Sequence, residues 1–212
     1  MEGYSSEQEQ VEAVKRWWRS NGKSVLVGVT IGVLVLIGGR LWIDHKNNQA
    51  LLAEEQYEQV LADLQRGEKA AAVDRGGRLL EQSRASPYAA LTALVLAKHK
   101  MDDNDQDGAK KYLQWVIDNA SLPALQDVAR LRLARVLLAA GDGAAALNVM
   151  QGVDEKAFTA PMQELKGDIL VSLNRLDEAR AAYSAALAGE PEAGEHERLQ
   201  MKLSALGGAQ SS

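Results

Sequence analysis

The longest apolar run of this chain lies near its start. From Val25 to Gly39 no residue is charged, and only Arg40 interrupts the run before Ile43. At about 1.5 Å of rise per residue, a helix over residues 25–43 is roughly 28 Å long, close to the roughly 30 Å hydrocarbon core of a bilayer. Its last residues, Gly-Gly-Arg-Leu-Trp-Ile-Asp, offer no small-x-small site for signal-peptide cleavage. The pattern therefore predicts one retained transmembrane helix over residues 25–43.

Tryptophans border this run at both ends. Trp17 and Trp18 stand before it, in the tail formed by residues 1–24, and Trp42 stands at its far end. Tryptophan is enriched where a membrane meets water. We therefore expect Trp17, Trp18 and Trp42 to be membrane-interface anchors.

Basic residues are concentrated on one side of the run. Four of them precede it, namely Lys15, Arg16, Arg19 and Lys23, whereas Arg40 and Lys46 border its other end. The end of a membrane helix that is richer in lysine and arginine stays in the cytoplasm. We expect residues 1–24 to be a cytoplasmic tail. Residues 44–206 are then expected on the opposite side of the inner membrane. In a Gram-negative bacterium that compartment is the periplasm. Residues 207–212, after the domain, are expected to be a disordered tail.

Gly28 and Gly32 stand one helical turn apart within the apolar run. Small residues at this spacing let two membrane helices approach closely. Both glycines are therefore candidates for helix packing, although the pattern does not indicate the partner.

Beyond Ile43 the apolar residues recur at helical spacing, and no stretch shows the two-residue period of a strand. The expected helices cover residues 47–65, 68–83, 87–100, 108–119, 125–140, 143–151, 160–173, 176–188 and 195–206. Their lengths and short connections are typical of antiparallel helical hairpins. The predicted fold is all-α, and the membrane helix can continue outward through Asn47 into the first hairpin.

The expected helices repeat in pairs. In the last clear pair, small and apolar residues fall at offsets 0, 3, 12, 16, 19 and 24, as in a tetratricopeptide repeat. They are Gly167, Leu170, Ala179, Tyr183, Ala186 and Pro191. Shifts of 33 and then 37 residues give comparable sets that begin at Ala134 and Ala97, and a degenerate pair lies over residues 57–79. Since no hairpin buries its apolar side alone, we expect a tetratricopeptide-like array of three to four hairpins. Its repeat-packing residues are Gly167, Ala179, Tyr183, Ala186 and Pro191.

Charge and composition then narrow the function classes. Beyond Ile43 the sequence has 25 acidic and 19 basic residues, whereas a nucleic-acid-binding domain needs a basic face. The chain has no cysteine, which excludes thiol chemistry. We therefore expect no nucleic-acid partner.

One acidic loop is similar to a metal site. Residues 103–108 carry aspartate at positions 1, 3 and 5 and glycine at position 6, as in a calcium-binding EF-hand loop. Position 12 is Gln114, which lacks the required bidentate carboxylate. We therefore interpret the loop as an acidic turn before a helix and expect no metal.

The sequence shows no catalytic constellation. His45, His99 and His196 lack metal-ligand spacing. Neither a Gly-x-Ser-x-Gly elbow nor a glycine-rich phosphate loop is present. The expected protein is not an enzyme and has no catalytic residue, cofactor or metal.

Arg130, Arg132 and Arg135 lie in one expected helix whose apolar stripe falls on other positions. Two interpretations stay open for these arginines. They pair with acids of the neighbouring hairpin, or they line the concave groove of the array and contact a peptide there.

Four segments together resemble the YfgM-like family of bacterial inner-membrane proteins. They are Ser86-Pro87-Tyr88-Ala89-Ala90-Leu91, Trp115-Val116-Ile117-Asp118-Asn119-Ala120, Ala129-Arg130-Leu131-Arg132-Leu133-Ala134-Arg135, and Glu164-Leu165-Lys166-Gly167-Asp168 with Ala182-Tyr183. The resemblance covers nearly the full chain. It implies an ancillary subunit of the SecYEG translocon that works beside a PpiD-like periplasmic chaperone and transfers unfolded secretory clients to periplasmic chaperones. It also implies regulation of an envelope-stress response from the cytoplasmic side.

The sequence alone therefore leaves more than one function open. The first is a membrane-anchored scaffold at the Sec translocon. The alternative is an accessory activator or adaptor of a cell-envelope enzyme, for example one of peptidoglycan synthesis, that uses the same groove. A signal transducer that acts through the tail of residues 1–24 is a third.

Overall fold

The computed structural model describes residues 3–153, 159–189 and 193–208, and these ranges contain helices and turns but no strand. The predicted all-α fold is confirmed. The helices are α1 (Gly3–Gln65), α2 (Lys69–Gln82), α3 (Pro87–Asp102), α4 (Gln106–Asn119), α5 (Pro123–Ala139), α6 (Gly143–Met150), α7 (Thr159–Ser172), α8 (Leu176–Ala188) and α9 (Ala193–Gly208). Pro191, which was assigned to repeat packing, lies outside the described residues.

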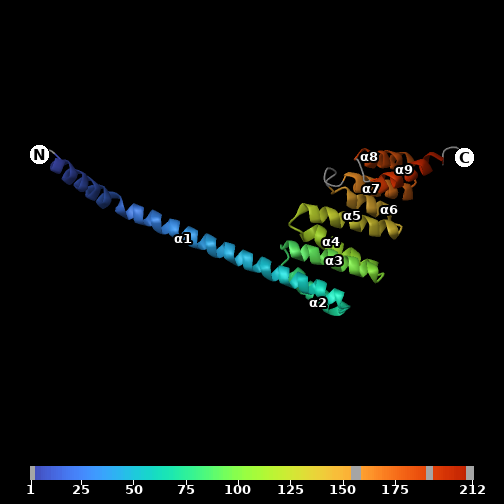
Figure 1. Cartoon of the computed structure of the whole chain (residues 1–212), viewed down its shortest axis with the longest axis horizontal. Helices are drawn as coiled ribbons and strands as arrows, with labels where there is room; N and C mark the ends of the chain where they lie inside the picture. The colour runs from blue at the N-terminus through green and yellow to red at the C-terminus, as the bar shows by residue number, and fades with distance from the viewer. Residues whose placement is uncertain (1–2, 154–158, 190–192, 209–212) are drawn as a thin grey trace. The chain divides into compact units, whose positions relative to one another are not determined.

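The first compact unit ends at Leu51 and consists of the N-terminal part of α1 (Figure 1). Helix α1 passes through the apolar run without a break. Side chains of the run are exposed, and Val35 and Leu36 reach 67% and 74% exposure. Exposure of this many apolar side chains to water is unfavourable, at about 25 cal/mol per Å². By length and composition, α1 is the one helix among the described residues that is able to cross a membrane.

The second compact unit begins at Leu52, within α1. The last part of α1 is the first helix of a hairpin with α2, so the helix expected over residues 47–65 continues the membrane helix through Asn47, as the sequence allowed. Val60, Ala72 and Leu96 are buried together where α1, α2 and α3 meet. This burial joins the first hairpin to the second.

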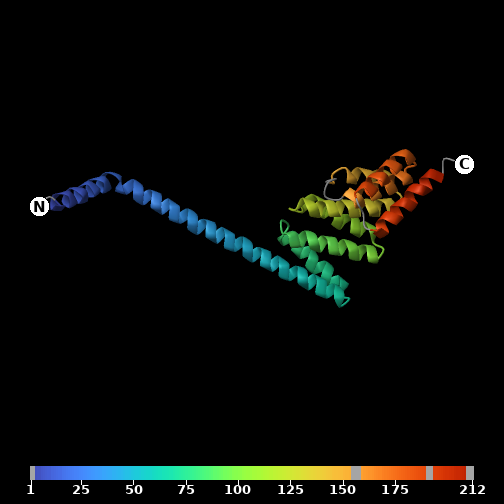
Figure 2. The same cartoon turned by 45° about the horizontal axis from the view of Figure 1, so that its top comes forward.

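Within the second unit, each helix from α2 to α9 packs against the next one along the chain (Figures 1 and 2). The described residues form four hairpins, α1/α2, α3/α4, α5/α6 and α7/α8, and α9 packs against α8. Small buried residues stand where helices touch, including Ala89, Ala93, Ala109, Ala134, Ala146, Ala179 and Ala186. This is the predicted tetratricopeptide-like array, with a further helix at its end.

One turn geometry closes all four hairpins. Gly67, Asn104, Gly141 and Asn174 each have a positive φ, between 57° and 83°. Glycine and asparagine tolerate this left-handed conformation better than other residues. After each of them a backbone N–H reaches a carbonyl oxygen five residues back, as from Asp142 to Leu137 at 2.9 Å. The turns recur after 37, 37 and 33 residues, which are the spacings of the sequence repeat.

Candidate functional site

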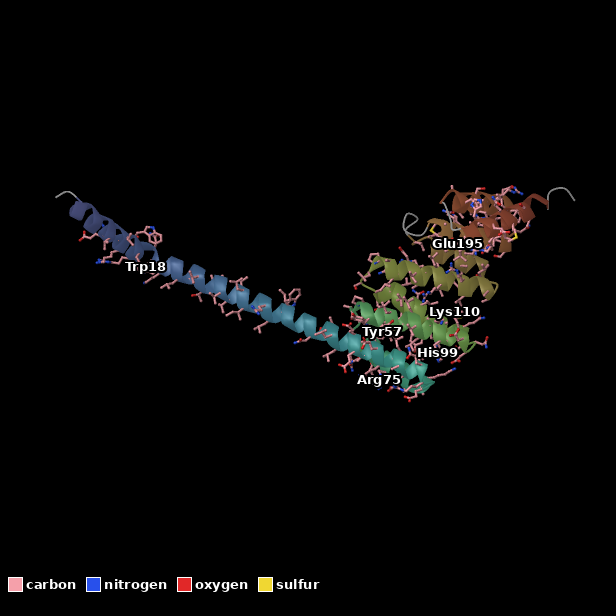
Figure 3. All side chains as sticks on the ribbon, in the orientation of Figure 1. Trp18, Tyr57, Arg75, His99, Lys110 and Glu195 are labelled. Atoms are coloured by element: carbon pink, nitrogen blue, oxygen red, sulfur yellow. The ribbon has the colours of Figure 1, made fainter. Side chains whose placement is uncertain are left out.

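The tryptophans expected at the membrane interface are exposed along α1. Trp17, Trp18 and Trp42 are 54%, 51% and 66% exposed, and Figure 3 shows Trp18 projecting from the helix. A Cβ added at Gly28 or Gly32 would meet nothing within 4 Å. In the single chain these two glycines thus leave an open helix face, and their role as a packing site stays a prediction.

The expected packing residues of the last hairpin lie where α7 and α8 touch. Ala179, Tyr183 and Ala186 are buried on α8. A Cβ added at Gly167 on α7 would lie 2.3 Å from Cε1 of Tyr183, so only glycine leaves room for the ring. The Tyr183 hydroxyl donates a hydrogen bond to Oδ1 of Asp168 at 2.7 Å. The pKa of this phenol is raised, first by burial and second by the hydrogen bond to Asp168.

Charged side chains tie α9 to α7. Lys202 on α9 donates to Oε1 of Glu164 at 2.8 Å and to Oδ1 of Asp168 at 2.7 Å. Arg198 donates two hydrogen bonds of 2.8 Å to the same Glu164 carboxylate. Hydrogen bonds from Arg198, and to a lesser extent from Lys202, lower the pKa of Glu164 to about 2, although burial of the carboxylate acts in the opposite direction. The terminal helix is therefore held by a charged network that spans 34 or more residues of sequence.

The acidic loop of residues 103–108 distributes its carboxylates among different cations. Asp103 pairs with Lys69 of α2, Asp105 with Lys100, and Asp107 with Lys110. Asp105 also accepts a hydrogen bond of 2.8 Å from the backbone N–H of Gly108 and so caps the N-terminus of α4. Within the described part of the chain, no three His, Asp or Glu side chains are placed to hold a metal ion. The loop acts as a helix cap and an ion-pair centre.

The histidines occupy separate environments. His99 lies on α3 (Figure 3) and is mostly buried. Its Nε2 lies 3.4 Å from Oδ2 of Asp103. His196 on α9 is exposed, and its Nε2 lies 2.9 Å from Nε2 of Gln200. The side chain of His45 lies outside the described residues. Within the described residues, neither His99 nor His196 belongs to a group of three side chains that could hold a metal ion.

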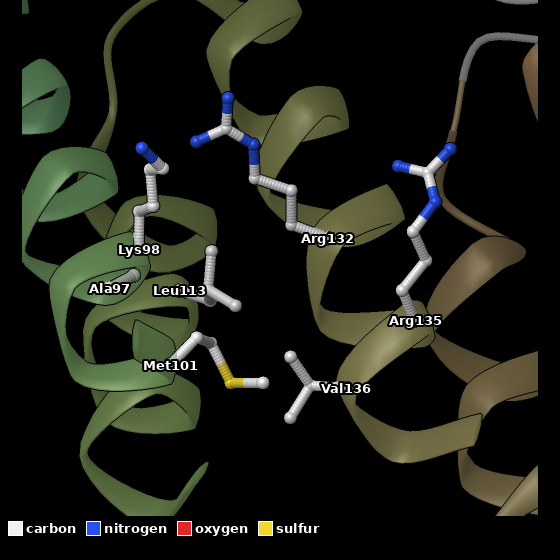
Figure 4. Close-up of a pocket in the computed structure, with 7 residues that line it drawn as sticks. All are labelled: Ala97, Lys98, Met101, Leu113, Arg132, Arg135 and Val136. Atoms are coloured by element: carbon white, nitrogen blue, oxygen red, sulfur yellow. The ribbon is translucent and has the colours of Figure 1, made fainter. Parts of the chain in front are cut away.

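The second unit carries an apolar pocket of about 280 Å³ between α3, α4 and α5 (Figure 4). Its apolar side chains are Ala97, Met101, Leu113 and Val136. Three cations border them, Lys98 from α3 and Arg132 and Arg135 from α5. In Figure 4 the side chains of Lys98 and Arg132 extend along the same side of the pocket, beyond Leu113. The site therefore combines an apolar floor with a positive rim.

The structure separates the three arginines that the sequence analysis grouped. Arg130 donates to Oδ1 of Asp127 at 3.0 Å, which lies on the same helix and not on the neighbouring hairpin. Arg132 and Arg135 instead line the pocket. Lys98 was not singled out in the sequence, because its position beside α5 depends on how two hairpins pack. The one sequence feature that points to Lys98 is its position one helical turn before the apolar Met101, which also lines the pocket.

Comparison with known proteins gives the family. The sequence model of the family described as a tetratricopeptide repeat-like domain matches residues 15–208. A protein of Escherichia coli (strain K12) is 32% identical over 206 residues, which cover 97% of this chain and 99% of the relative. A protein of Aggregatibacter actinomycetemcomitans is 29% identical over 206 residues, with 96% and 99% covered. A protein of Neisseria gonorrhoeae is 27% identical over 212 residues, with 97% and 100% covered.

Each of these relatives carries the name ancillary SecYEG translocon subunit. The match includes the membrane-length part of α1 as well as the helical array, because it covers nearly the whole of each chain. The chain therefore belongs to the YfgM-like family of ancillary SecYEG translocon subunits.

Proposed function

We propose that this chain is a non-enzymatic scaffold of the Sec translocon, anchored in the bacterial inner membrane by one helix. The observation that carries the proposal is the exposed apolar run of α1 in the same chain as a tetratricopeptide-like array. An anchor of this kind keeps a binding surface at the membrane. The names of the relatives indicate that the surface acts at SecYEG.

The orientation follows from the charges beside the apolar run. Lys15, Arg16, Arg19 and Lys23 precede it, and Arg40 and Lys46 border its far end. By the positive-inside rule the N-terminal tail is cytoplasmic, and the helical array is periplasmic. Trp17 and Trp18 then lie at the cytoplasmic interface, and Trp42 lies at the periplasmic one.

In the periplasm, the array mediates transfer of secreted polypeptides from the translocon to periplasmic chaperones. Stacked hairpins provide an extended surface that is suited to protein partners. Two kinds of partner fit this role: a PpiD-like chaperone that remains at the membrane, and unfolded clients that pass through. The apolar pocket between α3 and α5 is one place on this surface where a side chain of a partner is able to bind.

The cytoplasmic tail regulates an envelope-stress response in this proposal. Its support is the family resemblance together with the helical tail that continues into the membrane segment. Deletion of residues 1–16 tests this part by itself, because Trp17 and the apolar run remain. An unchanged stress-reporter level in the deletion strain would remove the regulatory role and leave the scaffold role intact.

Co-purification in a mild detergent tests the main proposal. The full chain with a C-terminal tag is expected to recover SecY, SecE and SecG in near-stoichiometric amounts. A matched control replaces residues 25–43 with an unrelated apolar membrane helix and keeps the array. Recovery of peptidoglycan-synthesis enzymes without translocon subunits would reject the proposal and favour the alternative, an adaptor of a cell-envelope enzyme.

A further inference from the structure

The pocket between α3, α4 and α5 has positive charge at its edge that forms no ion pair with the part of the chain that the structure describes. Arg132 and Arg135 are exposed, and so is Lys98. None of the three has an ion pair with any residue that the structure describes. Three cations that share one pocket repel each other, and an anion that binds between them relieves this repulsion.

This arrangement differs from the rest of the array. Most lysines and arginines of the described part of the second unit lie in ion pairs, namely Arg66, Lys69, Arg75, Arg78, Lys100, Lys110, Arg130, Arg175, Arg180, Arg198 and Lys202. The sequence beyond Ile43 is also acidic as a whole, with 25 acidic and 19 basic residues. Lys98, Arg132 and Arg135 are three of the six described lysines and arginines of this unit that form no ion pair with a described residue, and the other three, Arg84, Lys111 and Lys166, do not line the pocket.

The apolar floor defines the second requirement for an occupant. Met101, Leu113 and Val136 form this floor together with Ala97, and the whole pocket has a volume of about 280 Å³. This is just below the roughly 300–1,000 Å³ of typical small-molecule sites. The space suits one large apolar side chain better than a long acyl chain. The rim suits carboxylates, because a planar guanidinium donates two parallel hydrogen bonds to a carboxylate.

We propose that this pocket binds an acidic peptide segment of a partner protein, in which one apolar side chain is flanked by carboxylates. The apolar side chain enters between α3 and α5, and the carboxylates bind Lys98, Arg132 and Arg135. The inference rests on the proposed scaffold role, for which it names the chemistry of the partner segment.

Fluorescence anisotropy with a synthetic peptide tests the inference. The protein is the full chain in nanodiscs of neutral phosphatidylcholine, so that no anionic lipid competes for the cations. The probe is a fluorescein-labelled peptide of one leucine with two acidic residues on each side. One control peptide replaces every carboxylate with its amide, and a second replaces the leucine with serine. We expect the acidic leucine peptide to bind more tightly than both controls, and its binding to weaken as salt is raised.

Matched charge variants decide whether the pocket is responsible. The double variant Arg132→Gln/Arg135→Gln is expected to weaken peptide binding about tenfold at low salt, since each exposed ion pair contributes up to about fivefold. The control Arg84→Gln/Lys111→Gln also removes two positive charges, from exposed positions that do not line the pocket. It is expected to change the affinity by less than about twofold. All four side chains are exposed, so both variants are expected to fold.

Three results would overturn the inference. They are equal binding of the amide peptide, equal affinities of the two double variants, and binding of phosphatidylglycerol vesicles that depends on Arg132 and Arg135 while the acidic peptide does not bind. The assay contains no translocon subunit. Its failure would therefore leave the co-purification result standing, and failed co-purification would leave a positive peptide result standing.

Discussion

The Tyr183 ring occupies the space that a side chain at position 167 would need. A Cβ added at Gly167 would lie 2.3 Å from Cε1 and 2.5 Å from Cδ1 of the ring. Tyr183 is 3% exposed and donates its hydroxyl hydrogen to Asp168, so burial and a hydrogen bond together fix the ring. The last hairpin therefore depends on the absence of a side chain at one position of α7.

Gly167→Ala is expected to destabilise the array by about 1–3 kcal/mol, because overpacking outweighs the higher helix propensity of alanine. Thermal unfolding of the full chain in detergent, followed by circular dichroism, measures the effect. Gly77→Ala is the matched control, since a Cβ at this helical position meets nothing within 4 Å. The control is expected to gain about 0.5–1 kcal/mol. An equal gain in both variants would show that Tyr183 does not constrain position 167.

The turn residues give a second prediction. Gly141 has φ of +83°, and Asn174 takes φ of +57° at the equivalent place of the next hairpin. Gly141→Asn is therefore expected to cost only a few tenths of a kcal/mol, whereas Gly141→Val is expected to cost about 1–2 kcal/mol or more. Urea unfolding of the two variants compares them directly. Similar midpoints for both would contradict the requirement for a left-handed residue at this turn.

Local patterns in the sequence were sufficient to predict the architecture. The membrane-length run and the helical hairpins depend on short-range periodicity, which reads directly from the chain. The repeat spacings of 33 and 37 residues also coincide with the turns at Gly67, Asn104, Gly141 and Asn174. Helix α1 runs without a break from the apolar run through Asn47 into the first hairpin, as the helical spacing allowed, because no glycine or proline stands between Ile43 and Gln65.

The pocket was only half predictable. Arg132 and Arg135 stood out because they avoid the apolar stripe of their own helix. Lys98 lies 34 positions earlier in the sequence, and its meeting with Arg132 depends on the register between two hairpins. Asp63 shows the same limit: it is 1% exposed, and its partner Arg75 belongs to the next helix. Contacts between helices are set by side-chain packing, for which one sequence carries no periodic signal.

The contact between α7 and α9 is expected to weaken in acid. The pKa of Glu164 is lowered from 4.5 to about 2, chiefly by the hydrogen bonds from Arg198. Because the folded state binds this proton less readily than the unfolded state, the stabilisation is complete above about pH 4.5 and is lost as the pH falls toward 2. Unfolding curves at pH values between 5 and 2 are expected to show a steeper loss for the wild type than for Glu164→Gln. Glu197→Gln, on an exposed position of α9, is the control and is expected to follow the wild type.

The proposed orientation is testable because the chain contains no cysteine. Single variants Ser6→Cys and Ser204→Cys place one thiol in the tail and one on an exposed position of α9. In intact spheroplasts, a membrane-impermeant maleimide is expected to label Ser204→Cys, whereas Ser6→Cys is expected to react only after detergent is added. This result follows if the four basic residues that precede the apolar run hold the tail in the cytoplasm. Labelling of Ser6→Cys in intact spheroplasts, with protection of Ser204→Cys, would reverse the orientation and place the array beside the cytoplasmic face of the membrane.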